Sequence, residues 1–285
     1  MPKKPAKTKT RLPAASGSNP IPVAPLSGAK GANQTQMTSP SYRLAAVDKD
    51  FLLGESMRGV RFMLEYAKVE EALELWAVRS TIVVFGSARF SPNGPADHKR
   101  WYEAARTFAR IASERGGALK HNQNPRDNVI ATGGGPGVME AANRGADDAG
   151  APSIGYNITL PHEQAPNSYS TPELTFRFHY FAMRKMHFAM RANALVVFPG
   201  GLGTLDELFE LLALRQTGKA PPIPVVLYDE AFWRDILDFD AMVKHGVISK
   251  ADLELFNYAE TPEQTWAILV KAGVLTRRLQ EQKLA

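Results

Sequence analysis

The sequence contains no cysteine. Disulfide bonds, thiolate zinc sites and cysteine nucleophiles are therefore excluded. It also has no apolar run approaching the roughly 20 residues that a membrane-spanning helix needs. Acidic residues are absent from the first 43 positions, although the remainder of the chain has many. These absences fit a protein of the cytoplasm, and we expect a cytoplasmic location without membrane association.

The positive charge is unevenly distributed. The 285 residues carry a formal net charge of +5, but seven basic residues and no acidic residue lie within residues 1–43. Residues 44–285 therefore carry −2. The basic character belongs to the first segment, so the composition gives no reason to expect a nucleic-acid partner.

Residues 1–43 are rich in Pro, Ser, Gly, Ala, Asn and Lys and almost free of large apolar side chains. Such a segment cannot bury enough surface to offset its ordering entropy, and we predict a disordered basic tail. No apolar core follows the basic start, so a signal peptide is not indicated. A transit peptide is the alternative, but the Lys- and Pro-rich start is not amphipathic. We expect residues 44–285 to form a single domain.

Apolar periodicity then alternates between two types of element. Helical spacing places five large side chains on one stripe of a helix over 48–79. Those side chains are Phe62, Tyr66, Val69, Leu73 and Trp76. Beyond it, short continuous apolar runs alternate with amphipathic segments. The expected strands are 81–85, 129–132, 153–158, 174–180, 194–198 and 223–228, and the expected helices are 97–116, 138–150, 181–193, 203–217, 230–245 and 262–273. Continuous apolar strands alternating with helices predict an α/β fold: a Rossmann-like, open and mostly parallel sheet with helices on both faces, preceded by an N-terminal helix.

Three glycine-containing turns follow predicted strands. They read "FGSAR" (85–89), "TGGGPGVME" (132–140) and "PGGLGTLDE" (199–207). A glycine turn leading into a helix N-terminus offers free N–H groups and a partial positive charge, which suit a phosphate. A single such turn is usually only a turn, but several on one protein indicate a phosphorylated small molecule. Neither a P-loop nor the G-x-G-x-x-G fingerprint of dinucleotide enzymes is present.

The third turn ends in acidic residues, which a phosphate site alone does not explain. The helix dipole favours an acid in the first turn, and that accounts for one of Asp206 and Glu207. Glu207 follows Gly203 by four residues and can project toward whatever the loop holds. A carboxylate beside a phosphate is useful if a cation forms there, such as a ribosyl oxocarbenium ion. Arg184 and Lys185 precede the same strand, and the alternative for them is a solvated basic helix face.

The stretches "GGGPGVMEAANRGA", "MRK" and "PGGLGTLDE", in this order, resemble the Lonely Guy family of cytokinin-activating phosphoribohydrolases, many of which were once labelled lysine decarboxylases. The resemblance covers about 81–218 and continues weakly to about 273. The long N-terminal helix and "PHEQAPN" (161–167) look more like the longer, bacterial second type. The resemblance implies a Rossmann-like fold that hydrolyses the N-glycosidic bond of nucleoside 5′-monophosphates to free base and ribose 5-phosphate, with neither metal nor cofactor.

Carried over position by position, the family's catalytic arginine and glutamate fall on Arg184 and Glu207. The expected substrate-binding residues come from the three turns and from the helix that carries the arginine. They are Ser87, Gly133, Gly134, Gly135, Gly137, Met139, Glu140, Lys185, Pro199, Gly200, Gly201, Gly203 and Thr204. Plant-type members carry glutamate where His187 stands and arginine where Met190 stands. This departure puts the plant substrate preference in doubt, and not the reaction.

The resemblance implies AMP or an N6-substituted AMP as substrate, and a homodimer or hexamer. Apolar side chains around the helices at 61–78 and 181–190 also favour self-association. One alternative is a non-catalytic carrier of nucleotides or of the molybdenum cofactor with the same fold. The decarboxylase label would require a Schiff-base lysine for pyridoxal phosphate. The lysine of the motifs, Lys185, stands among other cations, which argues against that role.

Overall fold

The computed structural model describes residues 32–120, 125–159 and 165–276. The chain divides into two compact units, Met1–Arg61 and Phe62–Ala285. In the first unit, α1 (Gln34–Thr38) and α2 (Lys49–Leu53) are short helices separated by single 3₁₀ turns. The predicted disordered tail lies outside the described residues as far as residue 31, and its boundary at residue 43 stays a prediction.

The second unit is built on one seven-stranded sheet with the order β4-β3-β2-β1-β5-β6-β7. Every neighbouring pair of these strands is parallel. The strands are β1 (Thr81–Phe85), β2 (Val129–Thr132), β3 (Ser153–Ile158), β4 (Thr175–Phe178), β5 (Ala192–Val197), β6 (Val225–Tyr228) and β7 (Asn257–Ala259). The predicted α/β class with an open parallel sheet is confirmed, and the short β7 is an additional strand.

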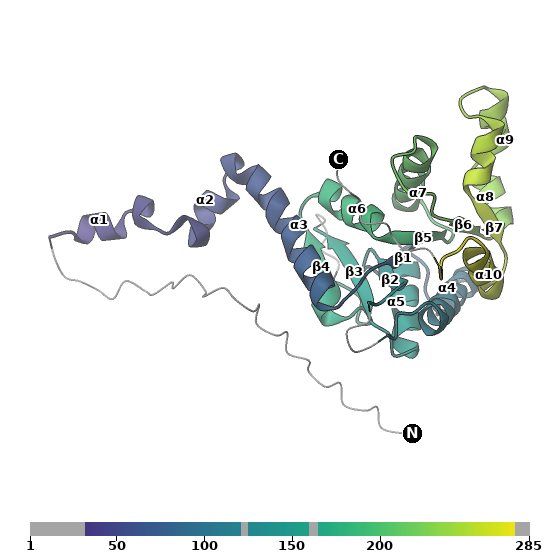
Figure 1. Cartoon of the computed structure of the whole chain (residues 1–285), viewed down its shortest axis with the longest axis horizontal. Coiled ribbons are helices and arrows are strands. Elements are labelled where there is room, and N and C mark those ends of the chain that lie inside the picture. Colours follow the sequence, from purple (N-terminus) through teal and green to yellow (C-terminus); the bar gives the residue numbers. More distant parts are fainter. Residues whose placement is uncertain (1–31, 121–124, 160–164, 277–285) are drawn as a thin grey trace, which may run out of the picture. The chain divides into compact units, whose positions relative to one another are not determined.

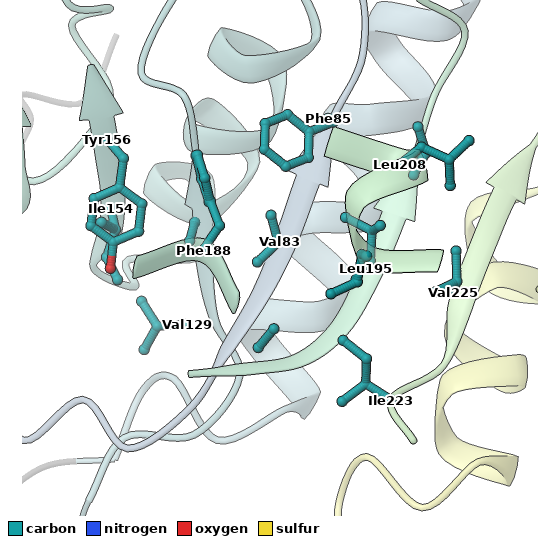
Figure 2. Close-up of a cluster of buried hydrophobic side chains, with 14 of the residues drawn as sticks. Val83, Phe85, Val129, Ile154, Tyr156, Phe188, Leu195, Leu208, Ile223 and Val225 are labelled. Atoms are coloured by element: carbon teal, nitrogen blue, oxygen red, sulfur yellow. The ribbon is translucent and has the colours of Figure 1, made fainter. Parts of the chain in front are cut away.

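Helices cover both faces of this sheet (Figure 1). They are α3 (Arg58–Leu75), which begins in the first unit, α4 (Ala96–Arg115), α5 (Val138–Asp148), α6 (Phe181–Met190), α7 (Leu202–Gln216), α8 (Glu230–Ile236), α9 (Phe239–Lys244) and α10 (Pro262–Lys271). Alternate side chains of β1 point to opposite faces of the sheet and pack in two different hydrophobic clusters. Val83 and Phe85 pack with residues of α3, α6 and α7, as Figure 2 shows for part of that cluster. Ile82 and Val84 pack on the other face with α4, α5 and α10.

Two predicted helices are interrupted. The expected helix over 48–79 is broken at Gly54, whose backbone is extended, so that α2 and α3 are separate. The expected helix over 230–245 is two helices, because Asp238 leaves the helical conformation and its carboxylate accepts a hydrogen bond from the Ala241 N–H at the start of α9. In both cases a residue that favours a helix end overrides the apolar period.

The order of the strands creates a topological switch point between β1 and β5. From β1 the chain moves outward through β2, β3 and β4, and then returns to the other side of β1 as β5. Connections leave β1 and β5 in opposite directions at their carboxyl ends, which is where open α/β sheets bind ligands. The three glycine turns follow β2, β1 and β5, three adjacent strands, so the fold gathers them at this switch point.

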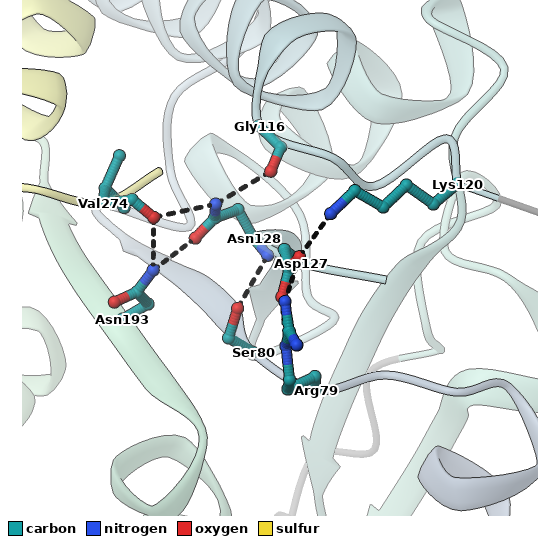
Figure 3. A network of polar contacts seen from close by, with 8 residues as sticks. All are labelled: Arg79, Ser80, Gly116, Lys120, Asp127, Asn128, Asn193 and Val274. Carbon is teal, nitrogen blue, oxygen red and sulfur yellow. Dashed lines mark hydrogen bonds and ion pairs between the residues drawn. The ribbon is translucent and has the colours of Figure 1, made fainter. Parts of the chain in front are cut away.

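A buried network of asparagine amides lies at the opposite end of the strands, where β2 and β5 begin (Figure 3). Asn128 has a positive φ of 56°. Its side-chain amide donates to the Gly116 carbonyl at 2.9 Å and its oxygen accepts from the Asn193 amide at 2.7 Å. The Asn193 amide also donates to the Val274 carbonyl at 2.8 Å. The two asparagines thereby join the amino ends of β2 and β5 to the segment after α10.

Asn128→Ala should lower the free energy of unfolding by about 2–4 kcal/mol, because it leaves buried amide and carbonyl partners unsatisfied and puts a poorly suited residue at positive φ. Urea unfolding followed by circular dichroism measures the loss. Asn93→Ala, at an exposed asparagine, should leave stability unchanged. A loss below about 1 kcal/mol at Asn128 would show that the network contributes little.

Candidate active site

Ser87 joins the three glycine turns. Its N–H donates to the Pro199 carbonyl at 3.0 Å, and its carbonyl accepts from the Val138 N–H at 3.0 Å. The turn after β1 therefore lies between the turns after β5 and β2. The predicted substrate-binding residues of these turns are brought to one place by main-chain hydrogen bonds.

The turn after β2 requires glycine at defined positions. Gly134 and Gly137 have φ values of 69° and 73°, in the left-handed region that glycine adopts without strain. A Cβ atom on Gly137 would lie 2.2 Å from the Ser87 carbonyl oxygen. Asn167 fixes the turn from outside, since its N–H donates to the Gly134 carbonyl at 2.8 Å and its amide to the Gly135 carbonyl at 3.1 Å.

The turn after β5 has a closed side and an open side. A Cβ atom on Gly200 would lie 2.1 Å from the Thr204 hydroxyl oxygen, so the threonine side chain folds back over this glycine. Gly201 and Gly203 are exposed, and a Cβ atom on either would meet nothing within 4 Å. No side chain caps the first turn of α7. Its backbone is thus accessible at the end of a helix, the arrangement that binds anions elsewhere.

Arg184 and Glu207 form a buried ion pair near these turns. The Arg184 Nη1 atom lies 3.7 Å from the Glu207 Oε1 atom, and the two side chains are only 11% and 6% exposed. Arg184 Nε donates to the Tyr156 carbonyl at 2.8 Å, and the guanidinium lies 5.2 Å from the centre of the Phe188 ring. A Cβ atom on Gly133 would lie 2.5 Å from Arg184 Nη2, so the guanidinium covers the turn after β2.

Burial dominates the electrostatics of this pair. It raises the pKa of Glu207 to about 7, with Arg184 and Lys185 opposing the rise. Burial also lowers the pKa of Arg184, against the attraction of Glu207 and Asp206. A carboxylate this costly to ionise and bound only loosely to its cation is typical of functional sites.

The remaining predicted residues have partners of their own. Lys185 Nζ lies 2.8 Å from Asp206 Oδ2 and 3.0 Å from Glu210 Oε2, so it joins α6 to α7. Glu140 accepts a hydrogen bond from the Tyr102 hydroxyl at 2.8 Å and lines an open pocket of about 310 Å³. Met139 packs on the turn after β2, since a Cβ atom on Gly133 would lie 2.8 Å from its sulfur.

The alternative of a solvated basic face does not apply to α6, the helix that carries Arg184. Arg184 and Arg191 are 11% and 20% exposed, and His187 is 1% exposed. His187 and Arg191 both face Glu70 of α3. Sequence reasoning missed this carboxylate, as well as the roles of Tyr156 and Asn167. Asn167 belongs to the stretch "PHEQAPN", which could have indicated its role. The main-chain carbonyl of Tyr156 gives no signal in a sequence.

Two glycine substitutions should separate folding from ligand contact. Gly137→Ala should lower stability by more than about 1 kcal/mol, because the new Cβ meets a main-chain oxygen at a positive φ. Gly203→Ala should raise the melting temperature slightly, because alanine favours the helix over glycine, and should weaken AMP binding, because its Cβ points into open space where a ligand would approach. Thermal unfolding and calorimetric titration measure the two effects. Unchanged AMP affinity in Gly203→Ala would remove this loop from the ligand site.

A family model described as "Possible lysine decarboxylase" matches residues 139–269. The probable cytokinin riboside 5′-monophosphate phosphoribohydrolase LOG4 of Oryza sativa subsp. japonica is 26% identical over 148 residues, which are 51% of this chain and 63% of that protein. The cytokinin riboside 5′-monophosphate phosphoribohydrolase LOG3 of Arabidopsis thaliana is 27% identical over 139 residues, which are 48% of this chain and 63% of that protein. The matches thus span less than two thirds of these relatives.

Among solved structures, the X-ray structure of TM1055 is similar with a TM-score of 0.47 and 21% identity, covering 67% of this chain and 99% of that one. The molybdenum cofactor binding protein from Rippkaea orientalis is similar with a TM-score of 0.44 and 19% identity, covering 68% and 97%.

The family model and the curated relatives are consistent with the resemblance of the three motifs to the Lonely Guy family. Among the described residues, no helix is long and apolar enough to span a membrane. The same residues include no group of three or more His, Asp or Glu side chains able to hold a metal ion.

Proposed function

We propose that this protein hydrolyses the N-glycosidic bond of adenine-type nucleoside 5′-monophosphates, AMP or N6-substituted AMP, to the free base and ribose 5-phosphate. The observation that carries the proposal is the pair formed by Glu207 and Arg184, 3.7 Å apart and buried beside an uncapped glycine turn. A phosphate site explains the turn. A reaction that builds positive charge explains the carboxylate.

In the proposed reaction, backbone N–H groups of the turn after β5 and the Thr204 hydroxyl hold the 5′-phosphate. This remote binding energy positions C1′ of the ribose near Glu207. The C1′–N bond breaks as water adds to C1′, and the base leaves with a proton. Glu207, as carboxylate, stabilises the oxocarbenium-like transition state and orients the water, as carboxylates do in glycoside hydrolysis. Arg184 donates hydrogen bonds to the phosphate or to the leaving base.

A non-catalytic nucleotide or molybdenum-cofactor carrier is the second candidate for this fold. A carrier of anions gains nothing from a buried carboxylate at its phosphate loop, because two negative charges repel each other there. The decarboxylase chemistry is disfavoured by a different contact. Burial alone would lower the pKa of Lys185, but its hydrogen bonds to Asp206 and Glu210 outweigh burial and raise that pKa. A Schiff-base lysine must be neutral to react, so this environment opposes the role.

Incubation with AMP, followed by chromatography of adenine and ribose 5-phosphate, tests the proposal. Adenosine is the control substrate, and we expect its turnover to be lower by roughly a hundredfold or more, because it lacks the positioning handle. Equal rates for AMP and adenosine would refute the phosphate assignment. Tight AMP binding without adenine release would favour the carrier.

Self-association and a cytoplasmic location are part of the proposal. In α3, Val69 and Leu73 are buried, while Met63 and Leu64 are 61% and 52% exposed. Exposed apolar side chains of this size favour a homodimer or hexamer, in which they would be covered.

A further inference from the structure

Helix α6, which carries Arg184, is not held at its start by its own sequence. Its N-cap residue, Tyr180, has extended backbone and offers no capping hydrogen bond from its side chain. A ten-residue helix of this kind is marginal by itself, and its position depends on tertiary contacts.

A carboxylate of α3 completes the start of α6. Glu65 Oε1 accepts from the His179 N–H at 2.8 Å, and Glu65 Oε2 accepts from the Tyr180 N–H at 3.3 Å. The Phe62 ring meets the Tyr180 ring edge-on, with centroids 4.4 Å apart. Glu65 therefore acts as a cap supplied by a distant helix.

A second carboxylate of α3 holds the end of α6. Glu70 Oε2 accepts from Nη2 of Arg191, the C-cap residue, at 2.6 Å. Glu70 Oε1 lies 3.6 Å from His187 Nδ1. Burial alone would raise the pKa of Glu70, but the neighbouring His187 and Arg191 outweigh it and keep that pKa below its ordinary value. Glu70 is thus an ionised anchor.

Arg184 lies between these two anchors. It follows Tyr180 by four residues and precedes His187 by three, about one helical turn from each. The turn after β5, which holds the phosphate in the proposed reaction, has no residue on α3 or α6. A small shift of α6 moves the Arg184 guanidinium relative to Glu207 directly, whereas it reaches the phosphate loop only through the ion pairs of Lys185 with Asp206 and Glu210 of α7. Misplacement of about 1 Å is enough to cost two orders of magnitude in rate.

We propose that Glu65 and Glu70 are positioning residues for Arg184, and that α3 is part of the catalytic architecture. The proposal rests on the proposed function. Both glutamates lie outside the region matched by the family model, residues 139–269, and outside the three glycine motifs. Their role is to hold α6 at both ends, so that the guanidinium and the Glu207 carboxylate stay in register.

Glu65→Gln and Glu70→Gln test the proposal, with Glu71→Gln as the matched control on an exposed position of the same helix. The first measurement is amide hydrogen exchange of residues 181–190. We expect about tenfold faster exchange in Glu65→Gln and Glu70→Gln, and unchanged exchange in Glu71→Gln and in α7. The second is AMP turnover. We expect kcat/KM to fall about tenfold in both variants, because a displaced Arg184 guanidinium serves neither the phosphate nor the leaving base in full.

A double-mutant cycle excludes a merely structural effect. In an Arg184→Lys background the guanidinium is already gone, so adding Glu70→Gln should change kcat/KM by no more than about twofold. Equal fold losses in both backgrounds would indicate loss of folded enzyme and would overturn the proposal, as would unchanged exchange of α6. If the wild-type protein releases no adenine, the proposed function fails. The exchange measurement then decides alone whether α3 holds α6.

Discussion

Glu207→Gln should reduce adenine release from AMP by a hundredfold or more while AMP still binds. Glutamine keeps the size of the side chain but cannot offer a full negative charge to a ribosyl cation. Losses of about 10²–10³ are usual when one preorganised electrostatic contact to a transition state is removed. Initial rates by chromatography and AMP affinity by calorimetry give the two quantities.

Asp206→Asn is the control for this experiment. It removes a negative charge from the neighbouring position of α7, but from a side chain that is 55% exposed and paired with Lys185. We expect its turnover to stay within about threefold of wild type, because exposed charges act through high-dielectric solvent. If Glu207→Gln retains most of its activity, or if both variants lose the same amount, Glu207 does not have the proposed role.

The sheet and the location of the site could be predicted because their signals are local. The runs "TIVVF" and "ALVV" are apolar on both faces, which is typical of a parallel strand covered on both sides, and the glycine turns mark where those strands end. The Arg184–Glu207 pair was expected from the family resemblance, and the structure places the two side chains together. Their roles in catalysis stay predictions.

What could not be predicted depends on contacts between distant segments. The role of Lys185 as a link to Asp206 and Glu210 requires the relative position of α6 and α7, which no periodicity supplies. The same holds for Glu65 and Glu70, which look like ordinary polar positions on an amphipathic helix. In both cases the partners come from elements that only the tertiary fold brings together.

The raised pKa of Glu207 predicts that Glu207→Gln also changes the stability of the protein. The ordinary pKa of a glutamate is 4.5, and burial raises that of Glu207 to about 7 in the folded protein. Below pH 4.5 both folded and unfolded chains carry the protonated carboxyl. Between these values the folded state binds more protons, so stability falls as pH rises. Above pH 7 the Glu207 carboxyl is ionised in the folded protein, and the folded state carries the full free-energy cost of burying that charge.

Glu207→Gln removes that cost. We expect the variant to be more stable than wild type by about 3 kcal/mol at pH 8, which raises the melting temperature by about 5–10 °C, and to be nearly equal in stability at about pH 4.5. Thermal unfolding of both proteins from pH 4.5 to 8.5 gives the difference at each pH. A gain that is the same at every pH would come from packing and not from ionisation. A loss at pH 8 would show that the ion pair with Arg184 outweighs desolvation, and that the carboxylate is a structural partner of the arginine. A gain that grows with pH, together with loss of turnover, would show that the fold accepts a destabilising charge at the place where the proposed reaction needs it.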